Sequence, residues 1–197
     1  MKAQVYKFKI EYEDFENIIW RDAEVSSNYT LAKLGYLVLA AFDTLAYHLF
    51  FLEYDGKHYE IDLDGELEEE NIDPTEIKLN SMNLGVGSEI MMTYDYGCEQ
   101  VFKITLLEVR DMEKGTSTKY PKIIAGAGKG ILDDIFSEDF REIIDEIDKT
   151  GKSEHIYMNA YGENENWDYR DFDIELLNKS LRYEIETIRQ AYEGQLY

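Results

Sequence analysis

Apolar and polar residues alternate along residues 4–12, and this two-residue period is typical of a β-strand with one buried face. A second run of β-forming residues covers 18–25, after a polar turn. From residue 30 the period changes, and leucines recur every three or four positions. Thr30 or Asn28 is placed to cap the resulting helix. Because apolar residues cover most sides of this segment, we expect it to pack against a sheet.

Two hairpins follow the predicted helix. In the first, the β-rich runs HLFFLEY and KHYEI flank Asp55-Gly56, a dipeptide that accepts the positive φ of a tight turn. The second has the arms SEIMMTYDYG and QVFKITLLEVR and turns at Gly97. On its outgoing arm, Phe102, Ile104 and Leu106 are expected to share one face.

Helical patterns dominate the last third of the chain. A helix is expected near residues 137–149 with Ser137 as its cap, and a strand-like run covers 155–161. The segment 161–173 is interpreted as a polar connector anchored in the core by aromatic side chains, with a peptide-docking surface as its alternative. A C-terminal helix is expected over 173–192. Its apolar stripe consists of Leu176, Leu177, Leu181, Ile185 and Ile188.

Together these elements predict an α+β fold: a mixed, mainly antiparallel sheet with one early packed helix and two late helices. No repeat or long linker divides residues 1–197, so a single domain is expected.

The charge of the chain narrows the range of partners. Its 197 residues include 42 acidic and 20 basic side chains, for a formal charge of −22. Such a surface repels phosphate backbones and anionic lipids, so direct nucleic-acid or membrane binding is disfavoured. The single cysteine, Cys98, excludes an internal disulfide and fits a reducing compartment. With no secretion signal and no apolar run long enough to cross a bilayer, a cytoplasmic protein is expected.

Two segments suggest ligand loops without matching a known pattern. The acidic segment 62–76 lacks the spacing of a calcium loop and is interpreted as a solvated connector, with a cation-binding loop as the alternative. The run 125–130 (AGAGKG) suggests a phosphate loop. However, Ile123 occupies the position of the first required glycine, and Gly130 that of the required Ser or Thr. A flexible turn is therefore expected there.

Candidate metal and nucleophilic residues form no complete motif. His48, His58 and His155 are scattered, although the first two lie on opposite arms of one hairpin and can approach each other. Cys98 lies between acidic neighbours, whose charges raise a thiol pKa rather than lower it. Asp95, Glu99, Asp133 and Asp134 resemble a magnesium-binding set of carboxylates. In so acidic a chain, such clustering is also expected by chance.

Several runs of residues, in order along nearly the whole chain, resemble the plasmid pRiA4b Orf-three-like family. The most specific is Tyr94-Asp95-Tyr96-Gly97, which is similar to the family's Tyr-Asp-Phe-Gly-Asp. The others are Ile19-Trp20-Arg21, Thr30-Leu31, Phe42, His48-Leu49, Tyr120-Pro121, Gly126, Asp133-Asp134, Phe172-Asp173, Asn178 and Leu181. The family occurs on plasmids and mobile elements, and the resemblance carries no established biochemical activity.

The chain departs from the family pattern at positions that surround a possible pocket. Cys98, Gln100 and Phe102 stand where relatives have Asp, Trp and His. Gly35 and Thr44 replace a His and a Trp of the helix segment. Any chemistry that relatives perform there is expected to be lost or changed in this chain.

We therefore expect a non-enzymatic protein-binding or adaptor module, with no catalytic residue, cofactor or bound metal. The expected contact surface consists of His48, Asp95, Tyr96, Gly97, Asp133 and Asp134. The alternative is a divalent-metal-dependent hydrolase or nuclease that uses Asp95, Glu99, Asp133 and Asp134. A third hypothesis, suggested only by the charge, is an acidic mimic of DNA.

Overall fold

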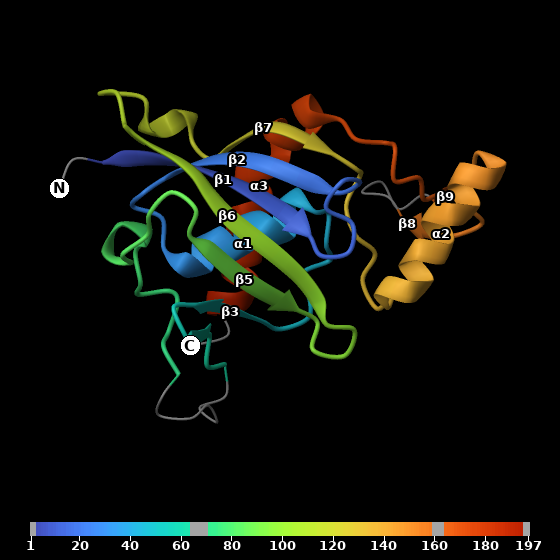
Figure 1. Ribbon diagram of the computed structural model, residues 1–197, viewed down its shortest axis with the longest axis horizontal. Helices are drawn as coiled ribbons and strands as arrows, with labels where there is room; N and C mark the ends of the chain where they lie inside the picture. Colours follow the sequence, from blue (N-terminus) through green and yellow to red (C-terminus); the bar gives the residue numbers. More distant parts are fainter. Residues whose placement is uncertain (1–2, 64–70, 159–163, 195–197) are drawn as a thin grey trace.

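A computed structural model describes residues 3–63, 71–158 and 164–194 (Figure 1). One layer is a seven-stranded sheet in the order β4-β3-β5-β6-β1-β2-β7, and each neighbouring pair is antiparallel. The α+β fold predicted from the sequence is thus confirmed. The strands of this sheet are β1 (Gln4–Tyr12), β2 (Trp20–Ser26), β3 (Phe50–Tyr54), β4 (Lys57–Glu60), β5 (Glu89–Tyr94), β6 (Gln100–Asp111) and β7 (Lys122–Ala127).

The remaining elements of the described residues are three helices, two short 3-10 turns and a small hairpin. The helices are α1 (Leu31–Ala41), α2 (Ser137–Thr150) and α3 (Ile174–Glu193). The 3-10 turns are Leu79–Ser81 and Ser117–Lys119, and the hairpin pairs β8 (Ile156–Met158) with β9 (Asn164–Asn166). No helix of the described residues is long and apolar enough to cross a membrane.

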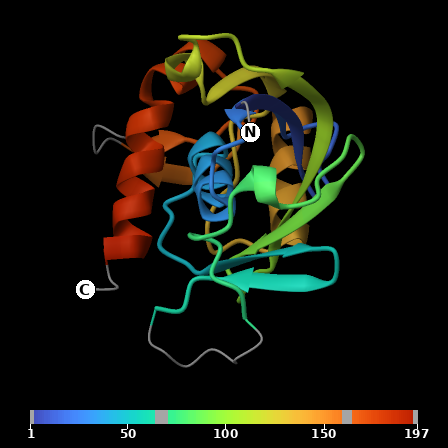
Figure 2. The same cartoon turned by 90° about the vertical axis from the view of Figure 1, so that its left-hand side faces the viewer.

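Helix α1 lies at the centre of the protein, between the sheet and α3 (Figure 2). All of its residues except Lys33 are buried, as its nearly continuous apolar pattern predicted. Thr30 caps the helix by accepting a hydrogen bond of 3.2 Å from the Lys33 amide. The predicted cap and the packing of the helix against a sheet are both confirmed.

Both predicted hairpins are present, as β3–β4 and β5–β6. On β6, Phe102, Ile104 and Leu106 are fully buried on one face, as expected. The acidic connector is described only at its two ends, because residues 64–70 lie outside the described residues. The strand-like run predicted at 155–161 is confirmed for β8, and its last residues also lie outside them.

The glycine-rich run differs from the turn predicted for it. Its first half belongs to β7, and the turn begins at Gly128, which has a φ of 75°. A Cβ at Gly126 would lie 2.9 Å from the Trp20 carbonyl oxygen and 3.0 Å from the Phe172 ring. Glycine is required there because strand β2 and the connector after β9 both approach the backbone closely.

Strand β7 helps to enclose a buried arginine. The Arg21 guanidinium donates to the backbone carbonyl oxygens of Trp20, Ala41, Ala127 and Lys129 at 2.5–3.0 Å. It also lies between the rings of Phe42 and Phe172. Burial lowers the pKa of Arg21 to about 9, which leaves the side chain charged at neutral pH.

Helix α3 covers the outer face of α1. Asp173 caps it, and Leu181, Ile185, Ile188 and Tyr192 are buried along one stripe. Leu176, which the sequence placed in that stripe, is 62% exposed. It lies five residues before Leu181. Five residues span about 1.4 helical turns, so Leu176 lies about 140° around the helix from Leu181 and outside the buried stripe.

Helix α2 and the β8–β9 hairpin project as a lobe from one end of the sheet (Figure 1). The buried Phe140 joins this lobe to the sheet by contacting Phe15 at 5.0 Å and Trp167 at 5.2 Å between ring centroids. Trp167 is 2% exposed, so it anchors the connector as predicted. The expected Ser137 cap was wrong: Phe136 is the N-cap and makes no side-chain hydrogen bond.

Candidate functional site

Three loops meet at the end of the sheet that borders the α2 lobe. They are residues 43–49 after α1, residues 95–99 between β5 and β6, and residues 131–136 before α2. Hydrogen bonds join them: the Leu45 amide donates to Asp133 at 2.9 Å, and the Gln100 side chain donates to the Leu132 carbonyl at 2.9 Å. We call this region the three-loop site.

Asp95 lies at the centre of the three-loop site and is 4% exposed. Its φ of 57° turns the chain sharply out of β5. The Asp95 amide donates to the Leu49 carbonyl at 3.1 Å, and its carbonyl accepts from the amides of Cys98 and Glu99. One carboxylate oxygen, Oδ1, accepts from the Gly97 amide at 3.1 Å, whereas Oδ2 has no hydrogen-bond partner in the described part of the chain.

The His48 ring faces two carboxylates. Its Nε2 lies 2.9 Å from Asp134 Oδ1 and 3.5 Å from Asp95 Oδ2. The ring packs edge-on against Tyr94 at 5.7 Å, and the His48 carbonyl accepts a hydrogen bond from the Tyr192 hydroxyl of α3. The histidine is therefore held in position through both its backbone and its ring.

Asp133 and Asp134 are neighbours in different environments. Asp133 accepts a hydrogen bond of 2.6 Å from the Tyr94 hydroxyl, and burial raises its pKa. The Asp134 side chain is 63% exposed and accepts from the hydroxyl of Tyr47 as well as from His48. These hydrogen bonds, with Tyr47 first, lower the pKa of Asp134. Asp133 joins the loops, and Asp134 faces solvent.

Of the residues expected from the sequence to form a contact surface, the structure brings His48, Asp95, Asp133 and Asp134 together, with Asp95 buried. Tyr96 is turned the other way: its hydroxyl donates to Glu60, and its ring packs on Phe51 at 5.5 Å between centroids. Gly97 contributes only the amide that Asp95 accepts from.

Among the described residues, His48, Asp95 and Asp134 are the group whose potential metal-binding atoms lie within 4.8 Å of one another. His58 is not part of it, because it pairs with Glu60 at 3.1 Å. Burial and the nearby Asp95 raise the pKa of the Cys98 thiol, the direction expected from its acidic neighbours. A thiol with a raised pKa is a poor nucleophile at neutral pH.

Sequence reasoning missed the aromatic and aliphatic side chains of the three-loop site. Tyr94 and Tyr47 hold the carboxylates, and Leu45 is 70% exposed beside them. Tyr94 was visible within the Tyr-Asp-Tyr-Gly motif. Leu45 could not be identified from the sequence, because an apolar residue in a loop can be either buried or exposed.

Comparisons with known proteins address the family and the fold. The family model described as "Plasmid pRiA4b ORF-3-like protein" matches residues 4–176. The chain belongs to this family. The pRiA4b ORF-3-like chain also resembles the crystal structure of protein of unknown function MM3350 from Methanosarcina mazei Go1. The TM-score is 0.72 at 21% identity, over 89% of this chain and 97% of the other, which supports the fold alone. No curated protein matches the chain.

Proposed function

We propose that this pRiA4b ORF-3-like protein is a non-enzymatic protein-binding module. Its contact surface runs from the three-loop site across Phe136 to the outer side of α2. The observation that carries this proposal is a concentration of exposed apolar side chains at one end of the molecule. It lies next to carboxylates of α2 that form no ion pair with a lysine or arginine among the described residues. Exposed apolar patches bordered by polar groups are typical of interaction sites.

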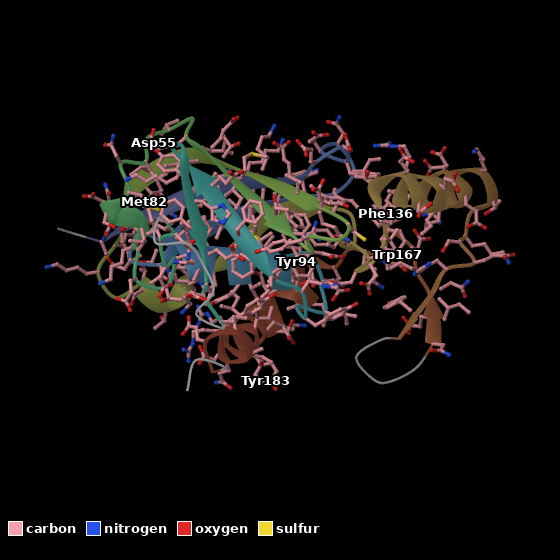
Figure 3. All side chains as sticks on the ribbon, turned by 90° about the horizontal axis from the view of Figure 1, so that it is seen from below. Asp55, Met82, Tyr94, Phe136, Trp167 and Tyr183 are labelled. Carbon is pink, nitrogen blue, oxygen red and sulfur yellow. The ribbon has the colours of Figure 1, made fainter. Side chains whose placement is uncertain are left out.

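The exposed apolar side chains come from two of the three loops. Leu45, Tyr47 and Leu49 lie on the loop after α1. Phe136, at the junction between the lobe and the sheet (Figure 3), is 56% exposed and begins α2. An exposed phenylalanine at a helix N-cap makes no capping bond and contributes little to the core, so its apolar surface is available to a partner.

A shallow groove beside α2 continues this surface. It has a volume of about 490 Å³ and begins at Ile135, which directly follows Asp134 in the three-loop site. Ile135 and Ile143 provide its apolar lining, and three carboxylates and one histidine border it. These are Asp139, Glu142, Glu146 and His155.

The charges around the groove define the kind of partner. In the described part of the chain, no lysine or arginine forms an ion pair with Asp139, Glu142 or Glu146. The basic residues of α2 are engaged elsewhere: Arg141 lies over the Phe15 ring, and Lys149 pairs with Asp145. A partner segment with apolar and basic side chains complements both features of the groove.

The test uses full-length protein and a fluorescent amphipathic peptide of lysine and leucine. Binding is measured by anisotropy for wild type and for the triple variant D139N/E142Q/E146Q. We expect this variant to bind about tenfold more weakly. The matched control E53Q/E108Q/E113Q makes the same change in net charge at three exposed positions outside the groove. It should lose less than about twofold. Equal losses in both variants would mean that the peptide senses only net charge.

Hydrolysis at a bound divalent cation is a second candidate, favoured by the convergence of Asp95 and Asp134 on His48. The test is turnover of phosphomonoester, phosphodiester, ester and peptide substrates with Mn²⁺ or Zn²⁺ present. Activity that is lost in D95N and retained in D139N supports this function. The same low activity in both variants excludes it.

A further inference from the structure

The orphaned oxygen of Asp95 is the strongest indication of a missing ligand in the three-loop site. A buried carboxylate oxygen without a hydrogen bond is unfavourable, because it has lost its water and gained no partner. Asp95 Oδ2 is in this state while Oδ1 is satisfied by Gly97. The unsatisfied oxygen points toward His48 Nε2, 3.5 Å away.

Two of the three separations between the potential ligand atoms are close to those of a metal site. Ligands about 2.1 Å from a cation lie roughly 3.0 to 3.4 Å apart when they occupy neighbouring positions. His48 Nε2 lies 2.9 Å from Asp134 Oδ1 and 3.5 Å from Asp95 Oδ2. All three atoms lie within 4.8 Å of one another.

The positions of His48 and Asp95 are set by contacts outside the cluster of potential ligands. Tyr192 and Tyr94 hold His48, and Leu49 and Gly97 hold Asp95. Ligands that are already oriented lose little conformational freedom when a cation binds. Asp134, with its side chain 63% exposed, leaves the cluster open to solvent on one side.

We propose that His48 Nε2, Asp95 Oδ2 and Asp134 Oδ1 together bind one divalent transition-metal cation, of the class of Zn²⁺ or Mn²⁺. The imidazole nitrogen favours these ions over Ca²⁺ and Mg²⁺, which prefer oxygen ligands alone. This differs from the sequence-based expectation of no metal. The proposal stands independently of both functions proposed above.

Binding changes the protons of the site in a defined way. In the metal-free protein, an Nε2–H of His48 is positioned to donate to Asp134 Oδ1. A cation bound at Nε2 uses the lone pair of that nitrogen, so Nε2 can carry no proton. The ring proton is then on Nδ1, and any second proton is released to solvent. Asp133 is not a ligand, because its two oxygens already accept from Tyr94 and Leu45. Three protein ligands leave the remaining coordination positions for water.

The experiment is calorimetric titration of chelator-treated, full-length protein with Zn²⁺ and with Mn²⁺, in parallel with Mg²⁺. We expect one Zn²⁺ or Mn²⁺ per chain at micromolar concentrations and much weaker Mg²⁺ binding. H48Q and D134N should each lower the affinity about tenfold or more. The matched control D139N removes one acidic charge from α2, outside the ligand set, and should keep the wild-type affinity. Circular dichroism confirms that each variant is folded.

D95N provides a second measurement that does not require cation binding. Removing the charge from a buried, unsatisfied carboxylate should leave the stability of the metal-free protein unchanged or increase it. It should also abolish the stabilisation that added Zn²⁺ gives the wild type.

The proposal is overturned if no saturable binding is found below about 1 mM. It is equally overturned if H48Q and D134N bind as wild type does. Saturable binding without peptide binding or turnover would remove the proposed functions and leave the cation site in place.

Discussion

The Tyr94 hydroxyl donates a hydrogen bond of 2.6 Å to the Asp133 carboxylate, 39 residues later in the chain. Tyr94 ends β5, and Asp133 lies in the loop before α2, so this one contact joins the sheet to the lobe. Asp133 also accepts from the Leu45 amide. All three loops of the three-loop site therefore depend on the placement of this carboxylate.

We expect Tyr94→Phe to destabilise the protein by about 1 to 3 kcal/mol, because a half-buried carboxylate loses its strongest donor. The free energy of unfolding is measured by urea denaturation. Tyr54→Phe is the control, because the Tyr54 hydroxyl donates to the neutral Asn83 carbonyl at 3.0 Å. It should cost about 0.5 to 1 kcal/mol. Equal losses would show that the charge of Asp133 adds nothing to the Tyr94 bond.

The buried arginine makes a second prediction. Arg21→Met removes the guanidinium donors to the carbonyls of Trp20, Ala41, Ala127 and Lys129. Buried carbonyls without a donor destabilise the folded state, so we expect the free energy of unfolding to fall by about 3 kcal/mol or more. Arg110→Met removes the partly exposed pair of Arg110 with Glu24 and should cost less than about 1 kcal/mol. A small effect at Arg21 would mean that water replaces the guanidinium.

Gly35 is predicted to be required because of one neighbouring ring. A Cβ at this position would lie 2.6 Å from Phe50 Cε2 and 2.9 Å from Phe50 Cζ. We expect Gly35→Ala to destabilise the protein by about 1 to 3 kcal/mol through overpacking. In a double-mutant cycle with Phe50→Leu, the two losses should be less than additive, because the smaller side chain makes room for the methyl group. Strict additivity would exclude the ring as the cause.

The steric limit at Gly35 also explains one departure from the family pattern. Relatives are expected to carry a histidine at this helix position, whereas here the Phe50 ring approaches the backbone of α1. A histidine Cβ at this position would meet the same ring between α1 and β3.

A pH series tests the hydrogen bonds to Asp134. Its pKa is lowered from the ordinary value of 3.8, chiefly by Tyr47. The folded protein therefore binds fewer protons than the unfolded chain in this range. The resulting stabilisation is present above about pH 4 and is lost as the pH falls through the folded-state pKa. Tyr47→Phe should reduce stability at about pH 6, and this loss should become smaller as the pH falls below about 4. Urea denaturation at each pH provides the measurement, and a pH-independent difference would contradict this account.

Much of the fold was predictable because local patterns agree with tertiary structure. The period of residues 4–12, the Asp55-Gly56 turn and the Thr30 cap all lead to elements that are observed. The prediction was wrong where a residue type is common in more than one kind of structure, as glycine is in turns and in closely packed strands. Gly126 lies in a strand rather than a turn because Trp20 and Phe172 approach it, and those contacts come from distant parts of the chain.

The candidate site was predictable as a region but not as a geometry. Family resemblance brought His48, Asp95 and Asp134 together on one surface. It did not reveal that Asp95 Oδ2 is buried without a partner, since that depends on which oxygen Gly97 satisfies. Tyr96, adjacent in sequence, contacts Glu60 instead, after the positive φ of Asp95 has turned the chain out of β5.

The most direct test of the proposed binding surface is amide hydrogen exchange of the full-length protein with and without the lysine–leucine peptide. The account predicts slower exchange in residues 131–149 and in the loop 43–49, with no change in β1 or β2. Protection confined to other segments, or spread evenly over the acidic surface, would contradict it.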